Sequence, residues 1–250
     1  MVLESAESQR AAKAMSEKLQ VLFEDNHCLA VAKPAPLLTQ GVPPGILTLE
    51  SMAKAYLKEK YAKRGNVYLG IPHRLDRPVS GVVLFARNTK AAQRLAEQFQ
   101  KHQVVKTYWA AVEGNVEPEQ GQWEDWLLKI PEEARSKKVS AETEGARQAV
   151  LQYRRLAVAP DMTLLEVRPR TGRMHQIRVQ AAEHGWPILG DVLYGSKLVF
   201  GLAASVPRER VIALHARSLQ FLHPIRFEPI NVVSPLPEYW AALPFNLNAT

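Results

Sequence analysis

The sequence predicts an α+β fold and not a doubly wound α/β fold. The short apolar runs that are typical of strands outnumber the amphipathic segments that are typical of helices. Most of these runs are joined by short turns, so each strand is expected to pair with its neighbour in sequence. With 250 residues, 46% of them apolar, the chain can form one large domain or two closely joined subdomains.

The first half of the chain is expected to alternate strands and helices. Pro34 ends the first hairpin, because proline cannot donate a hydrogen bond to a ladder. Thr48 and Thr89 carry hydroxyls that can cap the first turn of a helix. In order, the expected elements are an N-terminal extension of helical character (1–20), a strand hairpin (21–23 and 28–32), a helix (48–64), a buried strand (82–86), a helix (89–102) and a strand (104–114).

The second half is expected to consist mainly of strands. Its acidic segment 131–145 has the composition of a mobile loop. Gly185 ends the longest helix of this half. In order, the expected elements are two strands joined by a turn (151–158 and 163–169), a helix (173–185), two further strands (211–222 and 226–233) and a short terminal helix (238–243).

The net charge of +7 is unevenly distributed along the chain. Residues 58–106 contain eleven Lys or Arg against three acids, and residues 147–178 contain seven Arg against two acids. The segment 113–144 between them contains nine acids and four bases. Two basic blocks that converge in space would attract a polyanion such as a nucleic acid. The charge alone is equally compatible with a small protein that is simply basic.

The sequence disfavours several classes of protein and site. No apolar run approaches the ~18 residues of a membrane helix. Residues 1–20 lack the apolar centre of a signal peptide, so we expect a cytoplasmic protein. Cys28 is the single cysteine, which excludes an intrachain disulfide and a Cys-rich metal site. His175 and His184 do not have the spacing of H-E-x-x-H, and we expect no metal.

The segment 73–81 is the most informative stretch of the chain. It places Asp76 between Arg74 and Arg77, directly before the apolar run 82–86. An acid in a basic neighbourhood at the entrance to a core strand is a candidate reactive group. A kinase would show H-R-D with a Gly-rich loop and D-F-G, and the chain has none of these, so a phosphotransferase is disfavoured.

Arg178, in the predicted helix 173–185, is a second candidate. It lies on or beside the apolar stripe of that helix, and a guanidinium directed towards a core needs a carboxylate partner. Asp76 is the expected partner, and Asp191 is the other candidate. Such a pair would keep Asp76 ionised, which suits a nucleophile or a base, although a purely structural salt bridge explains the same residues. The polar residues of this helix expected to point elsewhere are Arg173, Gln176 and Gln180.

Lys106 and Tyr108 lie on the same face of the predicted strand 104–114. A tyrosine beside a basic group is a platform on which a nucleic-acid base can stack. Core packing with a tethered hydroxyl is the alternative for this tyrosine.

Five motifs follow one another along the chain. They are H-R-L-D-x-x-x-S-G at 73–81, K-x-Y-x-A-x-V-x-G at 106–114, P-x-T-G-R-x-H-Q-I-R at 169–178, G-x-P-I-L-G-D-x-x-Y-G at 185–195 and L-H-A-x-x-L-x-F-x-H-P at 214–224. In this order and spacing they resemble the RluA-type pseudouridine synthases, and the likeness extends from residue 21 to 235. It implies a mixed, mostly antiparallel central sheet in two subdomains (21–250) with a basic cleft between them. Because about 20 residues precede the first strand, we expect no N-terminal S4 domain.

By this resemblance the chain is expected to isomerise uridine in ribosomal or transfer RNA to pseudouridine, without a cofactor. The N1–C1′ bond breaks, the uracil turns, and C5 joins C1′. A carboxylate either attacks C1′ or removes the 2′ proton, and the sequence leaves both routes open. The implied catalytic residues are Asp76, Tyr108 and Arg178. The implied substrate-binding residues are His73, Arg74, Lys106, Arg173, His175 and Gln176.

RNA is therefore the expected partner, and we expect the protein to act as a monomer. The target nucleotide must leave its stack, and Arg74 would hold it and fill the space it leaves. The alternative is a non-catalytic RNA-binding module on the same scaffold.

Overall fold

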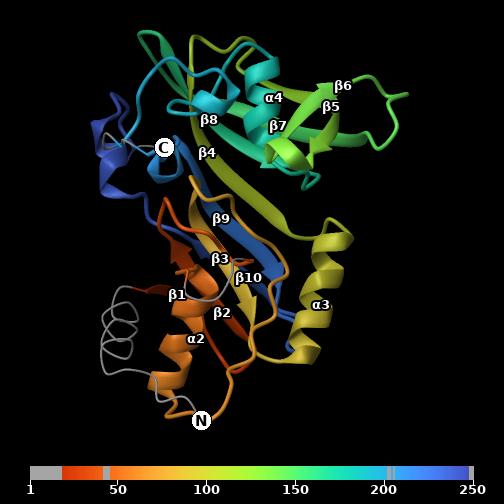
Figure 1. Cartoon of the computed structure of the whole chain (residues 1–250), viewed down its shortest axis with the longest axis vertical. Coiled ribbons are helices and arrows are strands. Elements are labelled where there is room, and N and C mark those ends of the chain that lie inside the picture. The colour runs from red at the N-terminus through yellow and green to blue at the C-terminus, as the bar shows by residue number, and fades with distance from the viewer. Residues whose placement is uncertain (1–18, 42–45, 202–203, 205, 248–250) are drawn as a thin grey trace.

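The computed structural model describes residues 19–41, 46–201, 204 and 206–247 of the chain. The predicted extension at 1–20 therefore lies almost wholly outside the described residues. Within them, three α-helices and four short 3₁₀ helices flank a single sheet (Figure 1). The helices are α2 (Leu49–Lys60), α3 (Thr89–Gln100), α4 (Gln176–Glu183), η1 (Pro131–Glu133), η2 (Val192–Tyr194), η3 (Pro207–Glu209) and η4 (Glu238–Ala242).

The sheet of the described residues has ten strands and is mostly antiparallel, which confirms the predicted α+β fold. The strands are β1 (Gln20–Glu24), β2 (Cys28–Lys33), β3 (Ser80–Ala86), β4 (Val105–Glu113), β5 (Gln120–Ile130), β6 (Arg135–Val139), β7 (Arg147–Ala159), β8 (Met162–Pro169), β9 (Leu214–Leu222) and β10 (Pro229–Val233). Their order across the sheet is β1-β2-β3-β9-β4-β8-β7-β5-β6, and β10 pairs with β9. Because β3 and β9 run parallel, the sheet is mixed.

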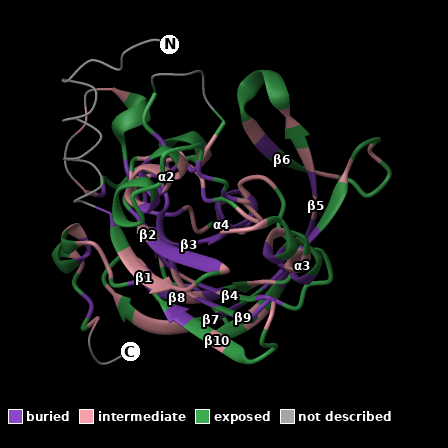
Figure 2. Cartoon of the chain, turned by 90° about the horizontal axis from the view of Figure 1, so that it is seen from below, coloured by how far each residue is buried: buried purple, intermediate pink, exposed green. Residues whose placement is uncertain are grey.

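The long sheet has two halves. In Figure 1 the lower half contains β1, β2, β3, α2 and α3, and the upper half contains β5 to β8 and α4. The strands β4 and β9 pair with each other between the two halves. All seven residues of β3 are buried, so this strand forms the centre of the lower half (Figure 2).

The helix termini differ in detail from the prediction. Thr48 caps α2 as expected, since its hydroxyl accepts a hydrogen bond from the Ser51 amide at 3.1 Å. The cap of α3 is Asn88 and not Thr89, because the Asn88 side chain accepts from the Ala91 amide at 2.9 Å. The helix predicted from 173 begins at Gln176, because His175 has a left-handed φ of 54° that a helix cannot continue.

The prediction of a mobile loop at 131–145 is wrong, because this segment contains η1 and the strand β6. The preceding strand β5 was not predicted at all. The reason is Asp125, an acid that interrupts the apolar pattern of β5 but is buried in the structure. Its carboxylate accepts hydrogen bonds from Lys138 at 2.7 Å and from Gln180 at 2.8 Å. Gln180 and Gln176, which were expected to point away from the core, are both buried.

The Ser80-Gly81 pair explains how the segment before β3 is held. Here β3 runs parallel to β9, with Ser80 opposite His215 and Gly81 opposite Ala216. The Ser80 hydroxyl lies 2.9 Å from His215 Nδ1. Gly81 has a φ of 121°, and a Cβ at this position would lie 2.3 Å from the carbonyl oxygen of Ala216. Only glycine therefore fits where the loop containing Asp76 enters the core.

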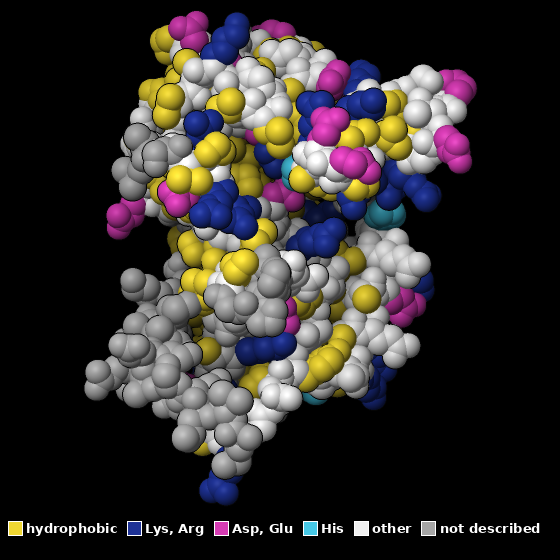
Figure 3. All heavy atoms as spheres, in the orientation of Figure 1, with side chains coloured by type: hydrophobic (Ala, Val, Ile, Leu, Met, Phe, Trp, Pro, Cys, Tyr) yellow, Lys and Arg dark blue, Asp and Glu magenta, His cyan; other side chains and the backbone are white. Residues whose placement is uncertain are grey.

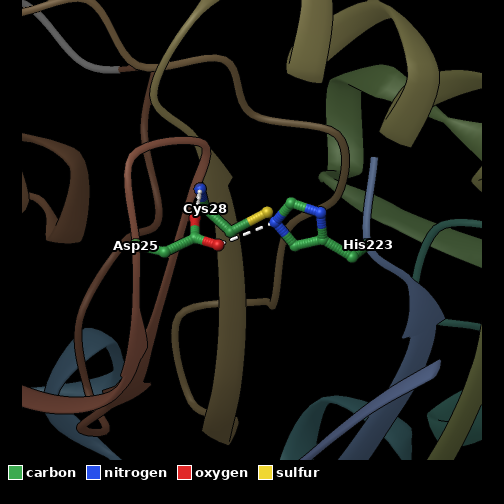
Figure 4. Close-up of side chains that lie close together, drawn as sticks. All are labelled: Asp25, Cys28 and His223. Atoms are coloured by element: carbon green, nitrogen blue, oxygen red, sulfur yellow. Dashed lines mark hydrogen bonds and ion pairs between the residues drawn. The ribbon is translucent and has the colours of Figure 1, made fainter. Parts of the chain in front are cut away.

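A polar cluster of Asp25, Cys28 and His223 joins the β1–β2 turn to the segment after β9 (Figure 4). His223 Nε2 donates to Asp25 at 2.7 Å, and Arg226 donates to the same oxygen at 2.9 Å. The other ring nitrogen of His223 accepts two backbone amides, which fixes the tautomer. Because the carboxylate and the imidazole already satisfy each other, we interpret the cluster as a structural link between two distant turns.

Among the helices that the structure describes, none is both long and apolar enough to cross a bilayer.

Candidate active site

Two cavities meet at Asp76 in the hollow between the upper and lower halves. The first, which we call the Tyr108 cavity, has a volume of about 640 Å³ and is lined by Lys106, Tyr108 and the first residues of α4. The second, the Arg210 cavity, has a volume of about 790 Å³. Figure 3 shows Lys and Arg side chains gathered around this hollow. Residues that line both cavities are Arg74, Leu75, Asp76, Met174, His175 and Arg178.

The backbone around Asp76 is fixed on both sides. The Thr39 hydroxyl accepts from the Leu75 amide at 3.1 Å and donates to the Leu75 carbonyl at 2.9 Å. The Arg77 carbonyl accepts from the Leu37 amide at 3.1 Å and from Lys33 Nζ at 3.2 Å. A loop held at the residues before and after Asp76 presents that carboxylate in a defined position.

Lys33 lies almost fully buried beneath this loop. Its ammonium group donates to the carbonyls of Leu37 at 2.6 Å and Pro34 at 3.1 Å, in addition to Arg77. Burial lowers the pKa of Lys33 to about 7, although the nearby charge of Asp76 acts in the opposite direction. No local pattern in the sequence marks this lysine, because a lone lysine at a strand end is usually solvent-exposed.

Arg178 lies between two carboxylates. Its Nε and Nη2 donate to the two oxygens of Asp191 at 2.6 and 2.8 Å, and its Nη1 lies 3.5 Å from Asp76 Oδ2. The expected pair with Asp76 is therefore present, but the bidentate partner is Asp191, which the sequence offered only as the other candidate. The side chain of Asp191 is 2% exposed, whereas that of Asp76 is 31% exposed. Asp191 fixes the guanidinium, and Asp76 keeps an oxygen surface open to the cavities.

Tyr108 forms part of the wall of its cavity, on the strand β4. Burial raises the pKa of Tyr108, and the negative charge of Asp76 raises it further. The phenol is therefore neutral at pH 7, and its hydroxyl has no hydrogen-bond partner among the described residues. The ring is available as an apolar surface beside the carboxylate.

His175 connects Asp76 to the strand β6. Its Nε2 lies 3.6 Å from Asp76 Oδ2, and its Nδ1 lies 2.9 Å from the Tyr194 hydroxyl. That hydroxyl also accepts from the Ser136 amide at 3.0 Å. Burial lowers the pKa of His175, with Asp76 opposing and Arg178 adding to the effect, so the ring is neutral at pH 7. The Tyr194 hydroxyl also donates to the Ser136 carbonyl at 3.2 Å, so it links the imidazole to the backbone of β6.

Thr171 organises the rim of the Tyr108 cavity. Its carbonyl accepts from Lys106 Nζ at 3.0 Å, and its hydroxyl donates to the Gln176 side chain at 2.7 Å. The Gln176 amide also donates to the Val150 carbonyl at 3.1 Å. Arg173 is exposed and donates to the Gln148 carbonyl at 2.9 Å. The side-chain amide of Gln176 is thus hydrogen-bonded within the protein, to Thr171 and to the Val150 carbonyl. Its contact with substrate stays a prediction.

His73 and Arg74 follow each other but have different surroundings. His73 Nε2 accepts from the Leu84 amide at 2.9 Å, and its ring stacks on Phe99 with centroids 4.7 Å apart. Burial, followed by the charge of Lys106, lowers the pKa of His73 to about 3, so the ring is neutral. Arg74 is exposed and lines both cavities. Arg74 is therefore free to contact a ligand, whereas His73 supports the cavity wall.

The site combines four features: a carboxylate held by a guanidinium, an aromatic ring, a cavity and a basic opening. A carboxylate is held by a fixed guanidinium, an aromatic ring lies beside it, and the cavity is large enough for a nucleoside. Lys and Arg side chains surround the opening. Such a site can direct a carboxylate at a carbon or a proton of a ligand that carries phosphates.

Comparison with known proteins identifies relatives of this site and fold. Residues 27–183 match the family model described as RNA pseudouridylate synthase. An uncharacterised RNA pseudouridine synthase of Zymomonas mobilis is 37% identical over 227 residues, which cover 90% of this chain and 97% of the relative. Ribosomal large subunit pseudouridine synthase D of Xanthomonas campestris is also 37% identical, over 93% of this chain and 70% of its own. A tRNA pseudouridine synthase C of Haemophilus ducreyi is 31% identical, over 90% and 94%.

A solved structure has the same fold. The human RNA pseudouridylate synthase domain containing 4 superposes with a TM-score of 0.75 and 25% sequence identity. The superposition covers 93% of this chain and 94% of the human chain.

Proposed function

The chain belongs to the RNA pseudouridylate synthase family, and from this premise we propose that it uses Asp76 to isomerise uridines of ribosomal or transfer RNA. The family assigns the reaction, which is the conversion of uridine in RNA to pseudouridine. The relatives described above are named for ribosomal and for transfer RNA, which supports both as targets. Neither these relatives nor the described structure offers support for a non-catalytic RNA-binding module.

The observation that carries the proposal is the position of Asp76. Asp76 belongs to the loop 73–81, lines both cavities and lies within 3.5 Å of Arg178 on α4. Its carboxylate lies 3.5 Å from Arg178 and 3.6 Å from His175, and the ring of Tyr108 lines the same cavity. We assign Asp76 as the catalytic carboxylate, with Tyr108 and Arg178 acting beside it.

The reaction is an isomerisation, so no atom is gained or lost overall. The N1–C1′ bond breaks, and its electron pair leaves with the uracil. Asp76 promotes this step by one of two routes. It attacks C1′ to form an ester bond, which breaks again and releases the carboxylate when C5 bonds to C1′, or it removes the 2′ proton, which it later returns. The uracil turns, C5 bonds to C1′, C5 loses its proton, and N1 gains one. In both routes the first act of the protein is to place a carboxylate oxygen beside the ribose.

The target uridine must leave its stack to reach Asp76. Flipping a base costs a few kcal/mol in a helix and less in a loop. Stacking on an aromatic side chain contributes ~1–3 kcal/mol per base, so a stack on Tyr108 offsets much of this cost. The Tyr108 cavity is also lined by Arg74, Lys106 and Arg173. We expect them to hold the phosphates, so RNA binding should weaken as the salt concentration rises.

A comparison of RNA from cells with and without this protein tests the proposed function. Pseudouridines are mapped in ribosomal and transfer RNA from a strain that lacks the gene. We expect at least one position to be lost and to return when the wild-type gene is restored. Purified protein should then modify the same position in RNA taken from the deletion strain. If no position changes in either RNA class, the proposed targets are wrong.

A further inference from the structure

We propose that the Arg210 cavity binds a nucleotide that neighbours the target uridine in the RNA chain. This inference rests on the proposed function, because it assumes that the target occupies the Tyr108 cavity. The ligand class is single-stranded RNA, with a base on the cavity floor and phosphates at its arginine rim. Three features of the cavity support this assignment.

The first feature is the connection between the two cavities. They share the wall formed by Asp76, His175 and Arg178, so a chain that leaves one cavity enters the other at the carboxylate. In an unstacked single strand, adjacent nucleotides are joined by a single phosphodiester linkage and must therefore bind close together. A uridine placed against Asp76 from the Tyr108 side therefore directs an adjacent nucleotide towards the Arg210 side.

The second feature is unused positive charge. Arg74, Arg77, Arg208 and Arg210 all line the Arg210 cavity. Within the part of the chain that the structure describes, none of their guanidinium groups makes a hydrogen bond or an ion pair. The acids that line the cavity are Asp76 and Asp191, and both already face Arg178.

Unpaired arginines that converge on one cavity suit a ligand that brings its own negative charge. A guanidinium binds a phosphate through two parallel hydrogen bonds, which gives both affinity and orientation. The four arginines come from two distant segments, the loop 73–81 and the segment around η3. They gather in one place only because the fold brings these segments together.

The third feature is an apolar floor and lip. Leu75 and Ile212 are buried at the base of the cavity, at 6% and 3% exposure. Val192 and Leu193, on η2, are 57% and 46% exposed at its edge. Neighbouring aliphatic side chains left open to water beside arginines offer a surface for the face of a base. The combination of apolar floor and basic rim fits a nucleotide better than a wholly polar anion.

Salt dependence of RNA binding tests the arginine rim. The variant combines Arg208→Ala with Arg210→Ala, and the matched control combines Lys63→Ala with Arg64→Ala. All four residues are exposed, and in the described structure neither control side chain has an ionic partner. The probe is unmodified RNA from the deletion strain. Pseudouridine mapping first verifies that the wild-type protein modifies this RNA. Affinity is measured over a range of salt concentrations.

We expect the rim variant to reduce the slope of log affinity against log salt by about 1.4, because each single-strand phosphate contact contributes about 0.7. The control variant should retain the wild-type slope. Unchanged thermal unfolding of both variants shows that only binding is affected. A rim variant with the slope of the control would overturn the inference.

A second measurement tests the base on the floor. A short RNA that contains the mapped uridine is made with an abasic residue on its 5′ or its 3′ side. We expect one of the two substitutions to weaken binding to wild-type protein by about tenfold, in line with the loss of one base contact. In the Leu193→Ala protein the same abasic substitution should weaken binding by a smaller factor, because the base has already lost its contact with Leu193. Strictly independent effects of the two changes would contradict a base in this cavity.

The outcomes separate this inference from the proposed function. If the wild-type protein forms no pseudouridine in either RNA class, both proposals fail. If it forms pseudouridine but the rim variant, the abasic RNAs and Leu193→Ala behave as their controls, only the Arg210 cavity assignment fails.

Discussion

Arg178 donates two hydrogen bonds to Asp191, at 2.6 and 2.8 Å, but lies 3.5 Å from Asp76. The two carboxylates therefore have different functions around one guanidinium. Asp191 is buried and fixes the arginine, while Asp76 remains partly exposed to the cavities. The arginine can then orient Asp76 without covering the oxygen that must meet the substrate.

Replacing Asp191 should lower the free energy of unfolding more than replacing an exposed acid does. Asp191→Asn leaves the guanidinium of Arg178 buried without its bidentate partner, and breaking a buried pair costs about 3 kcal/mol. Urea unfolding measures this change in the free energy of unfolding. Asp161→Asn, at an exposed turn, is the control and should cost little. A loss for Asp191→Asn no larger than that of the control would show that Arg178 does not depend on this carboxylate.

Tyr194→Phe should lower stability slightly and activity more. The lost hydroxyl contacts His175 Nδ1 at 2.9 Å and the Ser136 amide at 3.0 Å, and one buried hydrogen bond contributes about 1 kcal/mol. The imidazole beside Asp76 then loses its tether, so the single-turnover rate should fall while RNA affinity stays constant. Tyr68→Phe removes an exposed hydroxyl and serves as control. Equal rates for the two variants would show that the tether has no effect on the reaction.

Lys33 should make stability depend on pH. Its pKa is about 7 in the folded protein and near the ordinary 10.5 when unfolded. Between these values the unfolded chain holds a proton that the folded protein has released, so the free energy of unfolding rises with pH. The wild type should therefore gain stability relative to Lys33→Met between pH 7 and pH 10. A constant difference between the two proteins over this range would show that Lys33 keeps its proton on folding.

Gly81→Ala should destabilise the protein by roughly 3 kcal/mol, because the position combines a φ of 121° with a close contact to the Ala216 carbonyl. Gly65→Ala is the matched control, since a Cβ there has no atom within 4 Å. Chemical unfolding of both variants measures the difference. Equal stabilities would mean that β3 and β9 can separate at this point without cost.

The sequence was sufficient for the central pair of the site and for much of the fold. The helical spacing around Arg178 placed it near the core, and a charged group there needs an acid, so Asp76 and Asp191 could be named as candidates. The strand β3 was predicted from a continuous apolar run, all of which is buried, and β8 was predicted from its pairing with β7 across a short turn. These features depend on local patterns that are visible within ten residues.

Other features depend on contacts that no local pattern reveals. The strand β5 carries a buried acid, Asp125, and only the pairing with Lys138 and Gln180 makes that burial possible. Asp191, and not Asp76, makes the bidentate contact with Arg178, because the turn that ends at Asp191 brings its carboxylate to the guanidinium. The ammonium group of Lys33 is held by carbonyls from two separate loops. Each of these arrangements exists only after distant segments have come together.

The assignment of Asp76 as the catalytic carboxylate is tested most directly by Asp76→Asn. The measurement is tritium release from RNA that contains [5-³H]uridine, because C5 loses its hydrogen when it bonds to C1′. We expect the release rate to fall by at least about 10³-fold, since an amide can neither attack C1′ nor accept the 2′ proton. RNA affinity should remain within about threefold of wild type, because the phosphate contacts persist. Release at the wild-type rate by a folded, RNA-binding Asp76→Asn protein would contradict the assignment.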